Sequence, residues 1–241
     1  MTLEFIEAPS PNFDVRTKVP DMLVLHYTGM ETGEGALARL CDPEAKVSSH
    51  YMVEEDGRIF RLVPEERRAW HAGVSFWKGE EGVNHASIGI EIVNPGHEFG
   101  YRPFPQAQID AVIALVADIR TRWQIDDNRI LGHSDVAPAR KIDPGELFPW
   151  KQLAQAGHGI WVEADPAPGD PLAEGAEGVG VFALQAGLTR LGYDCAPSGR
   201  FDQATRETVS AFQRHWLQTR WDGVADGLTR ATLMAVLRAA G

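Results

Sequence analysis

The sequence predicts an α/β or α+β domain followed by a small, wholly helical domain. Three features carry this prediction. Apolar runs of strand length mix with an amphipathic helix before residue 150, an acidic stretch without hydrophobic period follows, and only helical patterns come after it. The 241 residues allow one or two hydrophobic cores, because a domain takes about 150 residues.

Two strand-rich segments open the first domain. Residues 22–28 (MLVLHYT) are apolar and β-branched, which predicts a strand buried on both faces. Residues 48–63 (SSHYMVEEDGRIFRLV) predict a hairpin of two short strands, because the dipeptide Asp56-Gly57 tolerates positive φ at a turn. Both segments therefore belong to a sheet.

Three further elements complete the first domain. Residues 87–94 (SIGIEIVN) alternate, with isoleucines on one face and Gly89, Glu91 and Val93 on the other. Residues 106–123 have the apolar spacing of a helix. Residues 129–135 (RILGHSD) predict a short strand that runs into a loop. The order of the strands in the sheet does not follow from these patterns.

A change of composition divides the chain. Residues 163–180 contain five acidic residues, no basic residue and many prolines and glycines. This composition predicts a flexible linker, because it buries too little apolar surface to offset the entropy of ordering. Net charge is −9 over residues 1–150 and +2 over residues 178–241, which supports two domains.

Three short helices are expected in the second domain, at residues 182–193, 204–216 and 229–240. We place the domains at residues 1–160 and 181–241, with the linker at residues 161–180.

Composition excludes several functions. The net charge of −11 leaves no basic surface for the phosphates of a nucleic acid. No apolar run approaches the roughly 18 residues that cross a bilayer, so we expect no membrane insertion. The N-terminus lacks a basic region followed by an apolar one, so no secretory signal is expected. Cys41 and Cys195 are too few for a disulfide framework, which favours a reducing compartment or indifference to redox conditions.

Two histidines at predicted strand ends suggest a metal site. His26 follows MLVL and His133 follows RILG, and strand ends are where rigid scaffolds present functional groups. Asp143 comes ten residues after His133. Two histidines and a carboxylate make three ligands with one open position, which is the composition of a catalytic zinc centre. Lys141 would lie beside such a metal as a fixed cation. The spacing leaves open the alternative that Asp143 is a turn or cap residue before Pro144.

Glu91 is a single carboxylate among apolar neighbours on its predicted strand. Such a group is either a paired core charge or an acid/base whose pKa is raised by burial, and the residues alone leave both possibilities open. Among the other histidines, His85 is a candidate for lining a cleft. His97, His158 and His215 lie in polar contexts typical of a surface.

Five segments resemble, in the right order, the zinc-dependent N-acetylmuramoyl-L-alanine amidases of the type-2 amidase family (AmpD/AmiD-like). They are MLVLHYT (22–28), SSHYMV (48–53), WHAG (70–73), SIGIEIVN (87–94) and GHSDVAPARKIDPG (132–145). The resemblance covers about residues 10–155 and implies a mixed central β-sheet flanked by helices. Residues 182–237 resemble a three-helix peptidoglycan-binding module, through LQAGLTRLGY, GRFDQATRETVSAFQ and DGVADGLTRATL.

The resemblance implies catalytic roles for five residues. His26, His133 and Asp143 correspond to the ligands of one Zn²⁺ per chain. Glu91 corresponds to the acid/base carboxylate, and Lys141 to the cation that stabilises the tetrahedral oxyanion. All five are present, so no departure from the family pattern puts the catalytic set in doubt.

Four further residues are candidates for substrate binding. His71 and Asn84 are expected to line the groove. Arg140 is expected to pair with a peptide or muramyl carboxylate, the alternative being a solvated loop charge. His50 is either functional, at the substrate or behind the metal ligands, or simply packed in the core.

The implied function is hydrolysis of the amide between N-acetylmuramic acid, or its 1,6-anhydro form, and L-alanine of the stem peptide, in cell-wall turnover or recycling. A phage-type endolysin and a non-catalytic peptidoglycan sensor are the alternatives. We expect a monomer whose partner is peptidoglycan or a muropeptide.

The C-terminal module is expected to be a flexible tether to the wall, and rigid packing against the amidase is the alternative. The absent signal favours the cytoplasm, whereas a wall-binding module fits the periplasm or cell wall.

Overall fold

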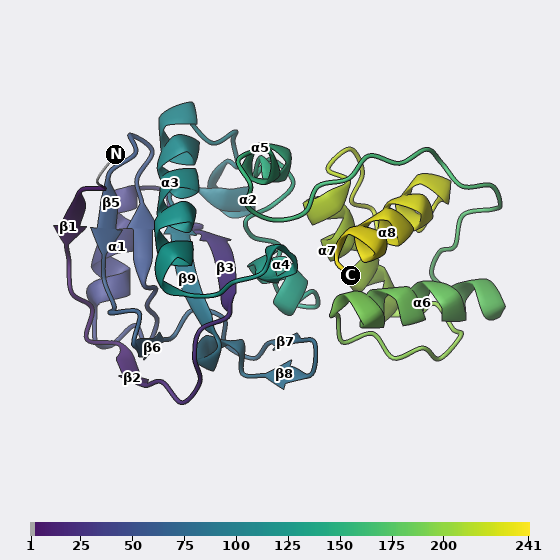
Figure 1. Cartoon of the computed structure of the whole chain (residues 1–241), viewed down its shortest axis with the longest axis horizontal. Coiled ribbons are helices and arrows are strands. Elements are labelled where there is room, and N and C mark those ends of the chain that lie inside the picture. Colours follow the sequence, from purple (N-terminus) through teal and green to yellow (C-terminus); the bar gives the residue numbers. More distant parts are fainter. Residues whose placement is uncertain (1–2) are drawn as a thin grey trace.

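The computed structural model describes residues 3–241, so the first two residues of the predicted catalytic domain lie outside the described range. Its centre is a six-stranded sheet with the order β1-β5-β4-β9-β3-β10 (Figure 1). Strands β4, β9, β3 and β10 are parallel, β5 runs antiparallel to β4, and β1 pairs in parallel with β5. The strands are β1 (Phe5–Glu7), β3 (Met22–Tyr27), β4 (Tyr51–Val53), β5 (Ile59–Arg61), β9 (Ser87–Ile92) and β10 (Ile130–Gly132). The predicted mixed α/β fold is confirmed.

Two short sheets lie beside the central one. They pair β2 (Phe13–Val15) with β6 (Arg67–Ala69), and β7 (Phe76–Trp77) with β8 (Glu80–Glu81). The predicted hairpin is β4 and β5, and residues 22–28 and 87–94 supply β3 and β9. The segment after β10 is a short helix, α4 (His133–Val136), where a loop is predicted. The helix forms because the Asp135 side chain accepts a hydrogen bond from the Gly132 N–H at 2.7 Å and so caps its first turn.

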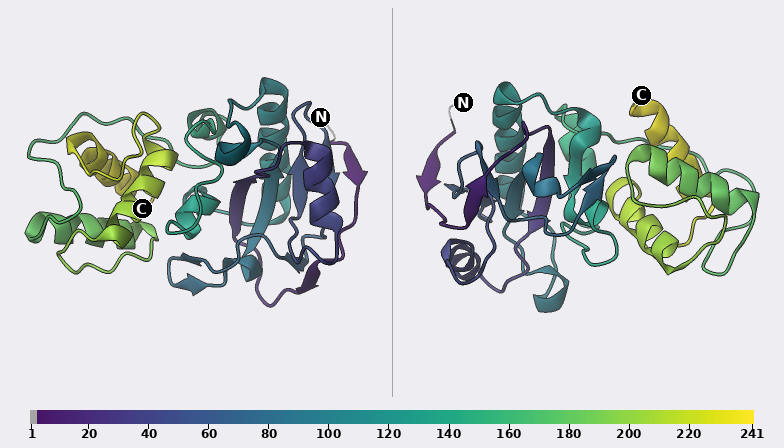
Figure 2. Two further views of the ribbon diagram at one scale, coloured as in Figure 1. Left: turned by 180° about the vertical axis from the view of Figure 1, so that it is seen from behind. Right: turned by 90° about the horizontal axis from the view of Figure 1, so that it is seen from below.

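Helices cover both faces of the central sheet. On one face, alternate residues of β3 and β9 pack against α3 (Gln106–Arg122) and α5 (Trp150–Gln155). On the opposite face, α1 (Gly33–Cys41) packs against residues from β4 and β5. The views from behind and below show α1 and α3 on opposite sides of the sheet (Figure 2). The period-two alternation of the strands produces these two layers. Because β9 and β10 each pair in parallel with β3, the carboxyl ends of these three strands lie side by side at the same end of the sheet.

The C-terminal module contains the three predicted helices. They are α6 (Val179–Leu191), α7 (Gln203–Trp216) and α8 (Gly227–Ala239). Asp202 and Asp226 cap α7 and α8 by accepting from the backbone N–H groups of Thr205 and Thr229. Within residues 3–241, no helix is both long and apolar enough to cross a membrane.

The acidic segment before α6 differs from the predicted flexible linker. Leu172 forms a β-bridge with Ala225, and the Phe201 N–H donates to the Ala176 carbonyl at 2.8 Å. Leu172 and Ala176 also pack against the core of the module. Backbone pairing of this kind needs no hydrophobic period, which is why composition does not reveal it. The boundaries given above, at residues 160 and 181, remain a prediction from the sequence.

The module packs directly against the catalytic domain. One hydrophobic cluster includes Trp77 and Val136 of the first domain together with Tyr193 of the module. The Lys78 N–H donates to the Gly192 carbonyl at 2.8 Å across the same boundary. The structure thus matches the alternative of a packed module and not the flexible tether.

His215 is buried in this interface, although its sequence context predicts a surface position. Its ring stacks on Trp150 of the first domain and on Trp216 of its own helix, with both centroid distances at 3.7 Å. The neighbour that buries it comes from the other domain, so the local pattern of α7 does not show the burial.

Candidate metal centre and catalytic cleft

His26, His133 and Asp143 converge at the carboxyl ends of the parallel strands. The Nδ1 atoms of the two histidines are 2.9 Å apart, and Asp143 Oδ2 lies 3.1 Å from His26 Nδ1 and 3.0 Å from His133 Nδ1. All three side chains are buried. A tetrahedral zinc site with bonds of about 2.0–2.1 Å separates its ligand atoms by roughly 3.3 Å. The three atoms therefore fit three corners of such a site.

The protonation states of this cluster suit a divalent cation. Burial, together with the neighbouring His133, lowers the pKa of His26 to about 4, so the imidazole is neutral at neutral pH. Burial alone would raise the pKa of Asp143, but His133 and His26 outweigh it and hold the pKa well below its usual range. The cluster thus offers a neutral imidazole and a carboxylate, the forms that bind metal.

The hydrogen bond behind His133 assigns its tautomer. Its Nε2 lies 3.1 Å from the backbone carbonyl oxygen of Ala72. Because a carbonyl only accepts, Nε2 carries the proton and Nδ1 is left with a free lone pair. That lone pair points toward His26 and Asp143, as a metal ligand requires.

A chain of hydrogen bonds assigns the tautomer of His26. The Ser87 hydroxyl donates to the Val83 carbonyl at 2.7 Å, so its oxygen accepts from His71 Nε2 at 3.2 Å. His71 Nδ1 then accepts from His26 Nε2 at 3.0 Å, which leaves His26 Nδ1 unprotonated. His71 thus lies in the cleft and orients His26, a candidate metal ligand. Its predicted role in lining the groove for substrate stays a prediction.

Gly89 on β9 makes room for the His71 ring. A Cβ atom at position 89 would lie 2.5 Å from Cγ of His71. Any larger residue would displace that ring and its hydrogen bond to His26. The absence of a side chain at position 89 is therefore a requirement of the site.

We expect His71→Ala to weaken zinc binding by about 10- to 100-fold, because partners that orient a ligand histidine contribute about that much. Competition with a chromophoric chelator measures the affinity. His158→Ala is the matched control, since His158 hydrogen-bonds Arg120 and does not line the cleft. An unchanged affinity in His71→Ala would show that His71 does not orient His26.

Glu91 and Lys141 lie in the same cleft as the cluster. Glu91 pairs in register with His26 across β9 and β3. Its Oε2 atom is buried and has no hydrogen-bond partner within residues 3–241. Burial and then Asp143 raise the pKa of Glu91 well above its ordinary value, and Lys141 opposes them. The ammonium group of the half-buried Lys141 has no hydrogen-bond or ion-pair partner in the described part of the chain, so the cleft presents this cation and the Glu91 carboxylate to a substrate.

The other predicted substrate residues occupy different positions. His50 is fully buried; its Nδ1 accepts from the Gly89 N–H at 2.9 Å, and its Nε2 lies 2.9 Å from Arg16 Nη2. The position of His50 thus matches the alternative of a histidine packed in the core. Asn84 does not line the cleft. Its side-chain oxygen accepts from the backbone N–H groups of His71 and Ala72, and so supports the loop that carries His71.

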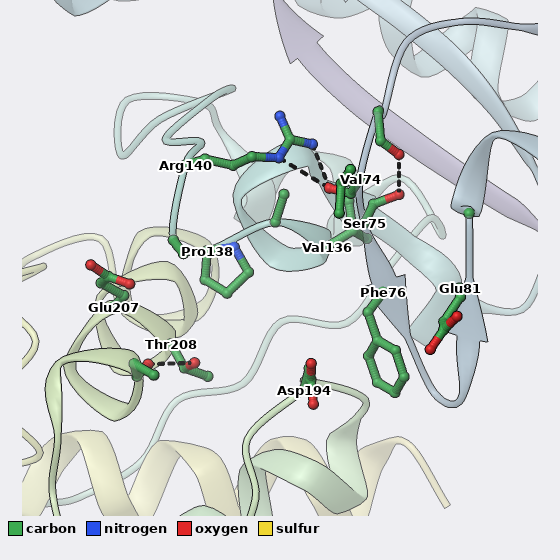
Figure 3. Close-up of a pocket in the computed structure, with 15 residues that line it drawn as sticks. Val74, Ser75, Phe76, Glu81, Val136, Pro138, Arg140, Asp194, Glu207 and Thr208 are labelled. Carbon is green, nitrogen blue, oxygen red and sulfur yellow. Dashed lines mark hydrogen bonds between the residues drawn. The ribbon is translucent and has the colours of Figure 1, made fainter.

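Arg140 lines both this cleft and a second cleft, which Figure 3 shows. Its Nε and Nη2 atoms donate to the carbonyls of Ala72 and Val74. These bonds hold the loop before β7 and leave Nη1 free of the described hydrogen bonds. Arg140 is therefore an exposed residue whose guanidinium is partly committed to the backbone. Its pairing with a peptide or muramyl carboxylate stays a prediction.

The catalytic cleft has a volume of about 410 Å³ and also includes Arg39 on α1. Arg39 is exposed, and its guanidinium has no hydrogen-bond or ion-pair partner among residues 3–241. Local sequence pattern does not indicate Arg39 as a site residue, because helix α1 itself is not predicted. His97, predicted on the surface, lines the rim of this cleft and hydrogen-bonds Glu146 through Nε2.

A second cleft, of about 670 Å³, lies between the catalytic domain and the module (Figure 3). The loop around Val74 and the end of α4 form one wall, and Asp194, Glu207 and Thr208 form the other. None of His26, His133 and Asp143 lines it. The module thus forms part of the surface beside the catalytic cleft.

A cluster of three potential metal ligands beside a carboxylate and an uncommitted lysine is the arrangement expected of a metal-dependent hydrolase. The match to known families agrees: residues 16–146 match the N-acetylmuramoyl-L-alanine amidase family, and residues 177–233 match a peptidoglycan binding domain. The chain belongs to the N-acetylmuramoyl-L-alanine amidase family, whose members are zinc enzymes that cleave the bond between N-acetylmuramic acid and L-alanine.

Relatives extend over most of the chain. AmiD of Escherichia coli is 40% identical over 240 residues, covering 91% of this chain and 83% of that protein. The structure of AmiD in complex with anhydro-N-acetylmuramic acid-L-Ala-D-gamma-Glu-L-Lys matches with a TM-score of 0.79 and 38% identity, over 95% of this chain and 93% of that one. AmpDh3 of Pseudomonas aeruginosa with an anhydromuramic pentapeptide matches with a TM-score of 0.74 and 30% identity, over 90% and 91% of the two chains. The predicted family and amidase activity are confirmed.

Proposed function

We propose that this amidase holds one zinc ion with His26, His133 and Asp143 and that its substrate is a 1,6-anhydro-muropeptide. The observation that carries the proposal is the convergence of the three ligand atoms, with each histidine Nδ1 left unprotonated by the bond behind it. The sensor alternative implies a missing ligand, whereas this set is complete. The anhydro-muropeptides in the complexes of AmiD and AmpDh3 support the substrate class.

Zinc in such a site supplies Lewis-acid chemistry, because it polarises a carbonyl group and lowers the pKa of water to about 7. Glu91 takes a proton from the attacking water as the oxygen–carbon bond forms. It returns that proton to the alanine nitrogen as the carbon–nitrogen bond breaks. Lys141 places a positive charge beside the oxygen on which negative charge develops.

The chemistry of the stem peptide suggests what Arg39 binds. A γ-linked glutamate, as in the peptide bound to AmiD, keeps its α-carboxylate free. Arg39 is an uncommitted cation on the rim of the cleft in this chain. We propose that it pairs with this carboxylate and places the scissile amide over Glu91.

The proposed function is tested by removing and restoring the metal. Purified protein should contain about one equivalent of zinc and should release the peptide from a soluble anhydro-muropeptide, measured by chromatography. A chelator should remove both zinc and activity, and added Zn²⁺ should restore them. Full activity in metal-free protein would contradict the proposal.

We expect Arg39→Ala to raise KM for the muropeptide by about fivefold with kcat unchanged, since a partly exposed ion pair contributes about 1 kcal/mol. Steady-state kinetics with a soluble substrate measures both constants. Arg58→Ala is the control, because Arg58 is an exposed arginine that pairs with Asp56 outside the cleft. A substrate whose glutamate α-carboxylate is amidated should show the same KM in wild type and Arg39→Ala. If the variant still raises KM for that substrate, Arg39 does not read the carboxylate.

A further inference from the structure

We propose that the C-terminal module helps to position a ligand of the metal centre. Tyr193 and His215 of the module hold the Asp135 carboxylate, and Asp135 holds the short helix α4 that presents His133. This inference rests on the proposed role of His133 as a zinc ligand. It gives the peptidoglycan-binding module a second role, in positioning a ligand.

Asp135 is the centre of a buried hydrogen-bond network that crosses the domain boundary. The residue is 1% exposed. Its Oδ1 accepts from the Tyr193 hydroxyl at 2.6 Å, and its Oδ2 accepts from His215 Nδ1 at 2.7 Å and from the Gly132 N–H at 2.7 Å. Of these three donors, only Gly132 belongs to the catalytic domain. Charge-assisted bonds of this length are the strong ones in proteins.

Helix α4 depends on Asp135 for its position. It has four residues, too few for a helix to be stable on its own. The Asp135 carboxylate caps its first turn, and the Ser134 N–H donates to the backbone carbonyl of Asp143 at 2.9 Å. A shift of α4 therefore moves the ligand His133 directly and pulls on the backbone of the ligand Asp143.

Aromatic packing holds both module donors in place. His215 is stacked between Trp150 and Trp216 at 3.7 Å from each. The Tyr193 ring packs edge-on against Trp77 of the catalytic domain, with centroids 4.9 Å apart. Burial and then Asp135 raise the pKa of Tyr193 well above its ordinary value, so its hydroxyl remains a donor. The two domains thus clamp the donors that fix Asp135.

Loss of the module donors would leave the buried carboxylate with one partner. An under-satisfied buried carboxylate is costly, and it recovers partners by rearranging or by admitting water. Either response changes the cap of α4 and the direction of the His133 ring. A merely structural interface would instead lower the melting temperature and leave zinc affinity unchanged.

The test uses the full chain, because truncation would expose the cluster that joins Trp77 and Val136 to the module. The main variant combines Tyr193→Phe, which removes one hydroxyl, with His215→Phe, which keeps a ring between the two tryptophans. We expect about tenfold weaker zinc binding by chelator competition and an altered visible spectrum of the Co²⁺-substituted protein. On a soluble anhydro-muropeptide, kcat should fall about tenfold with KM within twofold of wild type.

Asn128→Ala is the matched control. It removes the bond from Asn128 to the Ala240 carbonyl, which joins the domains at 3.0 Å without touching Asp135. Zinc affinity and kcat should stay within twofold of wild type in this control. If the double variant does not fold, Tyr193→Phe alone carries the test, with an expected threefold loss of zinc affinity.

Two results would overturn the inference. One is a folded double variant with wild-type zinc affinity, Co²⁺ spectrum and kcat. The other is an equal loss in Asn128→Ala, which would mean that any weakening of the interface has this effect. Zinc bound by the wild type and lost in His133→Ala would support the proposed metal site in either case, so the failure of this inference is distinguishable from the failure of the proposed function.

Discussion

Replacing His26 by alanine is expected to remove zinc from the protein and to lower kcat/KM by at least about 10³-fold. His26 and His133 each direct Nδ1 at the same point, and Asp143 completes the set. Two remaining ligands make a weak site, and the Lewis acid that is lost contributes several kcal/mol to transition-state stabilisation, where each 1.4 kcal/mol is tenfold in rate. Metal analysis of the purified variant should show far less than one equivalent of zinc.

His133→Ala should behave in the same way, because its Nδ1 is an equivalent ligand atom. His158→Ala again serves as the control and should retain both zinc and activity. Circular dichroism establishes that each variant is folded. Full zinc occupancy in both His26→Ala and His133→Ala would contradict the assignment of the metal site.

The sequence predicts the two candidate histidine ligands because strand ends are recognisable from local pattern. An apolar run identifies β3 and β10 as buried strands, and the residue that follows such a run is placed at the edge of the sheet. What local pattern does not predict is that β10 lies next to β3. This neighbourhood brings His133 to His26, and only the resemblance to a family implies it before the structure is seen.

Residues that act through long-range contacts escape sequence reasoning. Arg39 lies on a helix that is not predicted, and nothing in its neighbours indicates that it faces the cleft. His215 lies in a polar stretch of sequence but is buried by Trp150 of the other domain. In the same way, the acidic segment has the composition of a linker but pairs its backbone with the module. Burial in these cases comes from partners far away in the chain.

The Glu91→Gln variant is expected to retain zinc and lose about 10²- to 10⁴-fold in kcat, the range contributed by a general acid/base. Glutamine has the same size and is never a base. The Oε2 atom of Glu91 is buried without a hydrogen-bond partner in residues 3–241. A carboxylate oxygen that is buried without a partner costs stability, so its removal should leave the melting temperature unchanged or higher. If Glu91→Gln is less active but at least as stable as the wild type, its loss of activity is due to catalysis and not to misfolding.

The pH dependence gives this last prediction a second, independent readout. Burial and Asp143 raise the pKa of Glu91, so the base form appears only as the pH rises through that raised value. The kcat/KM of the wild type should therefore increase with pH over this range, and the residual activity of Glu91→Gln should lack that increase. Glu44→Gln, at an exposed carboxylate outside the cleft, is the control and should keep the wild-type profile. A Glu91→Gln variant with near-wild-type turnover, or with the same acid limb as the wild type, would assign the proton transfer to another group.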